Sequence, residues 1–327
     1  MLEFKHILYS KKSKIKPKRI ALTMKKTLLT LLVILTILPC FAQAVSEAKN
    51  EKLTVKLGVM QGPTGFSSSA LGDQVQIEVY PSPNEAVAKL IKGELDMIAL
   101  PANAAASLYN KGVEIKVVAI IGEGMLSIVG TENATNTTST TTTTLYVPGT
   151  GGTPDHMASL LYPEYEKEYS VTAPAQLAQL LIAGKVDLAI LPEPFVTMVL
   201  SKNSNLKIIS NVQERWTALT GQDNYPMSVL VVKDSFAQEH PSTVQEIKKA
   251  YKNSIETILS DPETAGTRIE ELGIMKAEMA TPALANCALT FKDGSQAKEE
   301  LLSYYTILLD LAPDAIGGKL PDDGLWL

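Results

Sequence analysis

The sequence predicts an α/β protein of two similar lobes, each built on βαβ units, and three observations lead to this prediction. First, residues 90–101 (LIKGELDMIALP) return as residues 181–192 (LIAGKVDLAILP) with six identities. Second, short apolar segments alternate with amphipathic ones, as in parallel sheets with crossover helices. Third, a chain of 327 residues is long enough for two modest lobes.

The repeat has the same internal order in both copies. Each copy fits the end of an amphipathic helix, a glycine that ends it, and a short apolar strand that finishes in proline. Candidate strands at residues 75–79 and 168–172 precede the two helices. We therefore predict two βαβ units with right-handed crossovers. A chance helix-strand resemblance is the alternative, but Gly, Asp and Pro recur in register.

The remaining elements follow from the same patterns of hydrophobicity and turn residues. Residues 133–144 are rich in threonine and lack apolar periodicity, which indicates an exposed connector. Further strands are predicted at residues 53–60, 115–120, 125–129, 145–147, 206–210 and 228–232, and helices at 102–110, 153–161, 194–200, 241–259 and 296–311. The expected organisation is a signal segment at 1–44, a first lobe at 45–130 plus 230–327, a connector at 131–144 and a second lobe at 145–229.

The amino terminus has the pattern of a secretory signal peptide. Two lysines precede the mostly apolar residues 27–42, and Ala-Gln-Ala at residues 42–44 fits a cleavage site. The apolar stretch is short for a membrane span, although an anchor or a buried helix is the alternative. Met24 is an alternative start, and Cys40 an alternative lipidation site that its preceding proline disfavours. We expect an exported protein, periplasmic or attached to the outer face of the cytoplasmic membrane.

The mature chain is expected to be strongly acidic. Cleavage after residue 44 removes nine of 30 basic residues and one of 35 acidic ones, which leaves a formal charge of −13. Such a surface argues against nucleic-acid binding. Cys287 then has no partner for a disulfide, and His156 and His240 are the remaining histidines. We predict no catalytic residue, no metal and no cofactor, and we expect a monomer.

Loops that lead from a strand into a helix are the candidate binding groups. Such loops present backbone N–H groups, and ligands of open α/β sheets bind beyond the carboxyl ends of the strands. We expect the loops of the two lobes to face each other across a cleft. The predicted ligand-binding residues are Gly62, Pro63, Thr64, Gly65, Phe66, Ser67, Pro101, Asn103, Gly149, Thr150, Gly151, Gly152, Thr153, His156, Glu193 and Phe195.

Several of these residues also fit a purely structural role. The glycine-rich segment at residues 149–152 also fits a flexible turn, and it lacks the Lys-Ser/Thr pair of a phosphate-binding loop. His156 also fits a capping or surface position. Trp216 and Tyr225 fit either stacking on a planar ligand or a place in the core. The aspartates of the two repeats begin strands at the end far from the loops, so we assign them a structural role.

The motifs, taken in order, resemble a known family. They are Gly-Pro-Thr-Gly at 62–65, Pro-Ala-Asn at 101–103, Pro-Glu-Pro-Phe at 192–195, Cys-Ala-Leu-Thr-Phe at 287–291 and the segment 317–323. With the paired Gly-x-x-Asp repeats, they resemble the nitrate/sulfonate/taurine-type ABC transporter substrate-binding proteins, in a branch with Gly-Pro-Thr-Gly after the first strand. The resemblance implies a type II periplasmic-binding fold, with two lobes, two crossing segments and a ligand trapped between them. The threonine-rich connector departs from the family pattern.

The resemblance and the residues together favour solute binding. The expected function is capture of a small polar or monoanionic molecule (sulfonate/taurine-like, nitrate-like or thiamine-pyrimidine-like) and its delivery to an ABC permease by hinge closure. The lack of arginine in the loops argues against a dianion. One alternative is an enzyme on the same fold, similar to those of menaquinone synthesis or to the cysteine-rich pyrimidine synthase of thiamine formation. Another is a ligand-sensing subunit of a membrane receptor.

Overall fold

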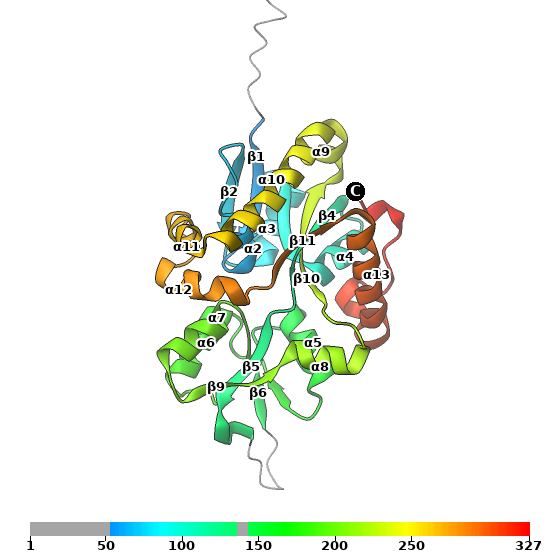
Figure 1. The fold of residues 1–327 in the computed structure, drawn as a ribbon. Helices are drawn as coiled ribbons and strands as arrows, with labels where there is room; N and C mark the ends of the chain where they lie inside the picture. The colour runs from blue at the N-terminus through cyan, green and yellow to red at the C-terminus, as the bar shows by residue number, and fades with distance from the viewer. Residues whose placement is uncertain (1–52, 136–142) are drawn as a thin grey trace, which may run out of the picture. The chain divides into compact units, whose positions relative to one another are not determined.

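The computed structural model describes residues 53–135 and 143–327, which form two α/β lobes (Figure 1). The predicted two-lobed α/β fold is therefore confirmed. The expected signal segment and residues 136–142 of the threonine-rich connector lie outside the described residues. The first lobe contains the strands β1 (Val55–Met60), β2 (Val75–Tyr80), β3 (Met97–Pro101), β4 (Ile115–Glu123), β10 (Pro226–Lys233) and β11 (Leu289–Asp293).

The six strands of the first lobe form one mixed sheet in the order β11-β4-β10-β3-β1-β2. β1 pairs in parallel with both β2 and β3, as the predicted βαβ unit requires. β10 lies antiparallel between β3 and β4, so it returns to the first sheet as expected. The second lobe contains the strands β5 (Leu126–Thr131), β6 (Thr144–Tyr146), β7 (Glu166–Glu168), β8 (Leu188–Pro192) and β9 (Leu206–Asn211).

The second sheet repeats the topology of the first. Its order is β7-β6-β8-β5-β9, with β6 parallel to β7 and β8. β5 lies antiparallel between β8 and β9, in the place that β10 occupies in the first sheet. The strands β3 and β8, which carry the two copies of the sequence repeat, therefore occupy equivalent positions. The duplicated sequence corresponds to duplicated topology.

The chain crosses between the sheets twice. The first crossing is at Gly124 and Met125, between β4 and β5, and the second runs through residues 221–225 before β10. The expected first boundary, after residue 130, therefore needs correction, because β5 belongs to the second sheet. Two apolar strands separated by only two residues look like neighbours in one sheet. The short strand β7 also begins and ends earlier than the expected strand at 168–172.

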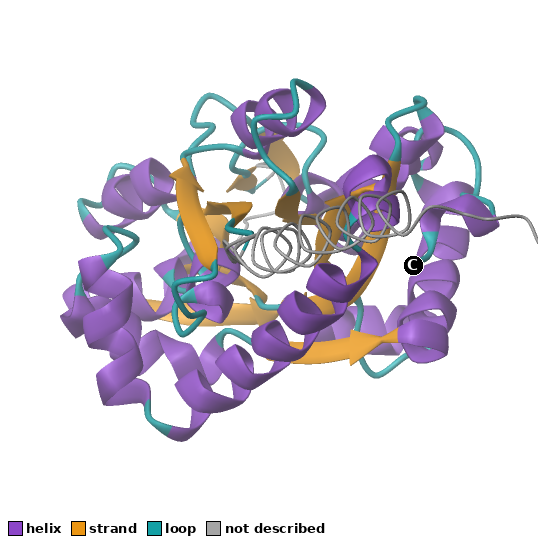
Figure 2. Ribbon diagram, turned by 90° about the horizontal axis from the view of Figure 1, so that it is seen from above, coloured by secondary structure: helices purple, strands orange, loops and turns teal. Residues whose placement is uncertain are grey.

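The helices cover both faces of the two sheets (Figures 1 and 2). Proline stands in the first turn of α2, α3, α5, α6, α10 and α11, where its missing N–H costs no hydrogen bond. None of the helices in the described ranges is long and apolar enough to cross a membrane. The helices are α2 (Pro63–Ser68), α3 (Pro83–Ile91), α4 (Ala102–Asn110), α5 (Thr153–Leu161), α6 (Pro174–Ile182), α7 (Phe195–Lys202), α8 (Val212–Thr220), α9 (Asp234–Glu239), α10 (Pro241–Ser260), α11 (Pro262–Glu271), α12 (Ala277–Ala283) and α13 (Gly294–Leu311).

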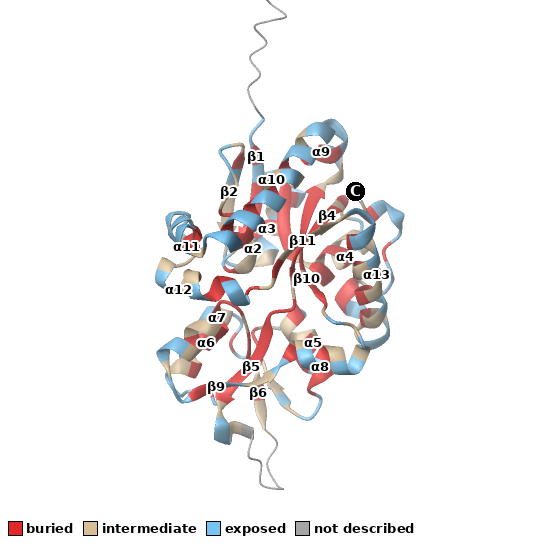
Figure 3. Ribbon diagram, viewed as in Figure 1, coloured by how far each residue is buried: buried red, intermediate tan, exposed pale blue. Residues whose placement is uncertain are grey.

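The central strands are buried on both faces, as Figure 3 shows. In β3, Ile98 and Leu100 pack into one cluster while Met97 and Ala99 pack into another on the opposite face. This pattern is typical of strands that carry helices on both sides. One of the clusters joins the two lobes, because it includes Trp216 from α8 as well as residues of the first lobe.

Candidate functional site

The four predicted strand-end loops follow the carboxyl ends of β1, β3, β6 and β8, and loops of opposite lobes meet. The hydroxyl of Thr153, in the second lobe, donates a hydrogen bond to Oδ1 of Asn103, in the first, at 3.2 Å. Both residues are buried. A Cβ atom built on Gly62 would lie 3.6 Å from Cδ of Pro194, so these two loops are also in contact. The structure thus brings the two predicted halves of the site together.

Asn103 is held from both sides of its amide. Its Nδ2 donates to the carbonyl oxygen of Ala315 at 3.4 Å, while its Oδ1 accepts from Thr153. The hydroxyl of Tyr305 donates to the neighbouring carbonyl of Ala102 at 2.8 Å and so fixes the start of α4. A buried polar side chain with partners on both its atoms is oriented, which suits a group that must present one geometry to a ligand.

The loop at residues 149–152 is braced by the first turn of α5. Gly149 and Gly151 have φ values of 77° and 75°, in the left-handed region that favours glycine. The N–H of Gly151 donates to Asp155 Oδ2 at 2.7 Å, and its carbonyl oxygen lies 3.1 Å from His156 Nε2. Burial lowers the pKa of His156. His156 therefore supports the loop from its own lobe, while Thr150 at the loop tip is exposed.

Four predicted contact residues instead pack or bond inside their own lobes. Phe66 is buried in the core of the first lobe, and the Ser67 hydroxyl lies 2.8 Å from the hydroxyl of Tyr251. Phe195 packs in the core of the second lobe. The Thr64 hydroxyl accepts a hydrogen bond from a main-chain N–H of β1 at 3.1 Å. These side chains hold the loops in place, because the short helices α2 and α7 turn them back toward their own sheets.

Close approach of backbone explains the second glycine of the Gly-Pro-Thr-Gly segment. A Cβ atom at Gly65 would lie 2.8 Å from the carbonyl oxygen of Met60 and 3.1 Å from the Ile274 side chain. Pro63 begins α2, and Pro101 ends β3 directly before α4. Both prolines are partly buried and fix where the loops turn.

Glu193 supplies a buried carboxyl group at the end of β8. The residue is 7% exposed, and its N–H donates to the carbonyl oxygen of Met125 at 3.1 Å. Its Oε2 accepts from the N–H of Thr197, in the first turn of α7, at 3.1 Å. Burial raises the pKa of Glu193. In the first lobe, the pKa of the Cys287 thiol is raised by burial and further by the charge of Glu193.

We expect Glu193→Gln to raise the stability of the ligand-free protein at neutral pH. A carboxyl group whose pKa is raised on folding loses its stabilising contribution as the pH rises from its ordinary value through the raised one, whereas glutamine does not titrate. The melting temperature of the variant should therefore match that of the wild type in acid and exceed it increasingly toward neutral pH. A difference that stays constant with pH would show that the carboxyl group is not responsible.

A second contact between the lobes lies beside α7. Nδ2 of Asn286 donates to the hydroxyl of Thr197 at 3.2 Å, and α12 of the first lobe lies next to α7 of the second (Figure 1). Asn286 is not predictable from the sequence, because its partner is far away along the chain and neither residue belongs to a motif. The side chain of Met275 packs against both lobe cores in the same region.

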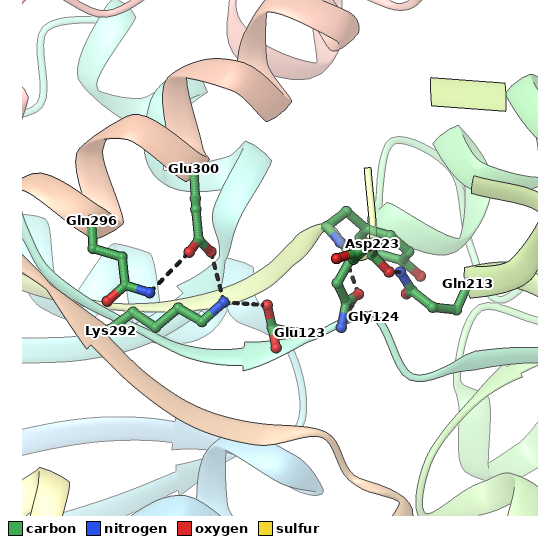
Figure 4. Close-up of polar contacts among 9 residues, drawn as sticks. Glu123, Gly124, Gln213, Asp223, Lys292, Gln296 and Glu300 are labelled. Atoms are coloured by element: carbon green, nitrogen blue, oxygen red, sulfur yellow. Dashed lines mark hydrogen bonds and ion pairs between the residues drawn. The ribbon is translucent and has the colours of Figure 1, made fainter. Parts of the chain in front are cut away.

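The second crossing segment and the end of β4 border a cavity of about 400 Å³ that is lined mostly by polar residues. Figure 4 shows Lys292 of β11 between Glu123, the last residue of β4, and Glu300 of α13, at 2.7 and 2.8 Å. Beside it, the N–H of Gly124 donates to Asn224 of the second crossing at 3.1 Å. The single lysine of the lining is thus paired with two carboxylates. We therefore assign this region a structural role between the crossing segments and α13, separate from the candidate site at the strand-end loops.

One protein family matches the sequence of this chain. Residues 65–306 match the profile of a family described as menaquinone biosynthesis (VitK2_biosynth), which spans most of the described chain. The chain belongs to this family. Members of the menaquinone-biosynthesis family are therefore its relatives by sequence, while no curated protein matches the chain.

The chain is also similar to solved structures of transport proteins. An ABC transporter from Parabacteroides distasonis is 26% identical and has a TM-score of 0.72, with 84% of this chain and 99% of that chain covered. The periplasmic aliphatic sulphonate-binding protein of Escherichia coli is 13% identical, with a TM-score of 0.63 and coverage of 82% and 92%. The periplasmic nitrate-binding protein of Synechocystis is also 13% identical, with a TM-score of 0.56 and coverage of 76% and 75%. The last two similarities show the fold, which is that of periplasmic substrate-binding proteins.

Proposed function

We propose that this protein captures a small organic molecule between its two lobes, outside the cytoplasm, and delivers it to an ABC importer. The observation that carries the proposal is the buried hydrogen bond between Thr153 and Asn103. It joins strand-end loops of opposite lobes, where a two-lobed protein that closes on a ligand needs contacts from both sides. The similarity to the ABC transporter from Parabacteroides distasonis supports the same assignment.

The location and the partners follow from the same proposal. The amino-terminal pattern supports export, to the periplasm or to the outer face of the membrane with or without lipidation at Cys40. A permease in the membrane would receive the ligand from the closed protein, which we expect to act as a monomer. The candidate contacts are the glycine loops, the buried amide of Asn103, the hydroxyl of Thr153 and the carboxyl group of Glu193.

A second candidate function is catalysis in menaquinone biosynthesis, and the family match favours it. Both functions use a ligand enclosed between the lobes, so they differ in what leaves the protein. A binding protein releases its ligand unchanged and in a stoichiometric amount. Mass spectrometry of the bound and released compound separates the two candidates, because repeated turnover would establish an enzyme.

Replacing Thr153 with valine should weaken ligand binding by about 5- to 150-fold. In the closed state of the variant, the buried Oδ1 of Asn103 has lost its hydrogen-bond donor, which costs about 1–3 kcal/mol. Valine keeps the shape of threonine, so the fold is preserved. The measurement is calorimetric titration with the compound that most raises the melting temperature in a metabolite panel. Thr267→Val is the matched control, because Thr267 is exposed on α11 and its hydroxyl donates to the carbonyl oxygen of Glu263 on the same helix. Equal affinity in both variants would contradict the site.

A further inference from the structure

Glu193 is unusual among the ionisable side chains of the protein. Of the aspartates, glutamates, lysines, arginines and histidines in residues 53–135 and 143–327, it is the one that is buried. Burying a carboxylate is costly unless a partner compensates its charge. The position therefore requires an explanation beyond ordinary packing.

The position of Glu193 is at the boundary between the lobes. It follows β8 directly, and the next residue, Pro194, lies against Gly62 of the first lobe. Its backbone N–H is bonded to Met125 of the first crossing segment. Its carboxyl group accepts from the N–H of Thr197, and the hydroxyl of Thr197 accepts from Asn286 of the first lobe at 3.2 Å. The carboxyl group thus lies beside contacts that join the two lobes.

Within the described part of the chain, the carboxyl group has no cationic partner. Its hydrogen bonds go to Thr197 in the first turn of α7, and none of the ion pairs includes it. None of the lysines and arginines in the described ranges is buried. The described part of the protein therefore supplies the carboxyl group of Glu193 but no buried cation to pair with it.

Several other groups at this boundary do not favour an anion. Asn103 and Thr153 are neutral, and the amino-terminal end of α7 already receives the oxygen of Glu193. The first turn of α5 carries Asp155, whose carboxylate accepts from Gly151. Helix amino termini attract anions, but here both second-lobe helices that start at the boundary have their own carboxylates.

We infer that the ligand is an organic cation, an amine or a protonated nitrogen heterocycle, whose charged nitrogen pairs with Glu193. This inference rests on the proposed binding function and narrows its ligand class. It departs from the sulfonate-like and nitrate-like ligands that the sequence resemblance suggests. The cation would offset the charge of the buried carboxylate, and both would be enclosed when the lobes close on them.

The test uses matched probes and two variants of the full chain. Benzylamine, ethylamine and imidazole are compared with benzoate, ethanesulfonate and acetate by thermal shift and calorimetry. We expect members of the cationic set to bind, and Glu193→Gln to weaken that binding by at least about tenfold, since the amide keeps the oxygen that caps α7 but loses the charge. Asp261→Asn is the control, because Asp261 also caps a helix, through a 3.1 Å bond from Thr264, but is exposed.

The outcomes separate this inference from the proposed function. Binding of the anions alone, absence of binding by every cationic probe, or full affinity in Glu193→Gln would each overturn the inference. If an anion binds and Thr153→Val weakens it, the binding function holds and only the ligand class is wrong. If the probes are instead converted catalytically, the proposed function itself fails.

Discussion

Valine at position 124 is expected to prevent the lobes from closing and to weaken ligand binding by about 5- to 150-fold. Gly124 lies in the first crossing segment, and a Cβ atom there would overlap the ring of Tyr225 and the amide of Gln213. Tyr225 is fully buried, so its ring cannot move aside without disturbing the shared core. Forcing extra atoms into such packing costs about 1–3 kcal/mol, and this cost lowers the stability of the closed state.

The measurement combines calorimetric titration with small-angle X-ray scattering in the presence of ligand. The variant should keep the larger radius of gyration of an open form at ligand concentrations that compact the wild type. Gly72→Val is the control, because a Cβ atom at that glycine meets no atom within 4 Å. Unchanged affinity and unchanged compaction in Gly124→Val would show that the crossing segments tolerate the added side chain and do not limit closure.

Removing the indole of Trp216 is expected to lower the free energy of unfolding by about 3–5 kcal/mol. The side chain is fully buried, with ring centroids 5.3 Å from Tyr225 and 5.8 Å from Tyr304. Trp216 comes from the second lobe and Tyr304 from the first, so Trp216→Ala leaves a cavity in the core that joins them. The effect is measured by denaturant unfolding followed by circular dichroism.

Leu219→Ala on the same helix is the matched control, since Leu219 is 56% exposed and its loss should change stability by less than about 0.5 kcal/mol. Trp216→Phe should cost less than alanine, because the buried indole N–H has no hydrogen-bond partner in the described structure. A loss for Trp216→Ala no larger than that of Leu219→Ala would contradict the central place of this side chain.

Much of the fold is predictable from the sequence because local patterns and long-range topology agree. The repeated segments correspond to β3 and β8 with their preceding helices, and the predicted helix at 153–161 has the bounds of α5. The boundary expected after residue 130 was wrong, because the chain already changes sheet at Gly124. β4 and β5 are both apolar, and the sequence contains no signal for the change. The helices α11 and α12 were not predicted, because their short patterns resemble a loop interrupted by proline.

The contact between the candidate loops was predictable from the sequence, whereas the directions of their side chains were less so. The strand-end rule correctly placed Asn103 opposite Thr153, since parallel strands end at a common edge. The directions of Phe66 and Phe195 depend on how their helices pack, which the sequence does not specify. The network around Lys292 joins residues distant in sequence, so no local motif indicates it.

The place of β10 between β3 and β4 has a consequence for how the chain folds during biogenesis. The second lobe is one continuous stretch, from β5 to α8, and contains every strand of its sheet. The first lobe remains incomplete until that whole stretch has been synthesised, because only then does its central strand become available. We therefore expect the second lobe to acquire structure first. Until then, β3 and β4 of the first lobe each keep an unpaired edge that is prone to aggregation.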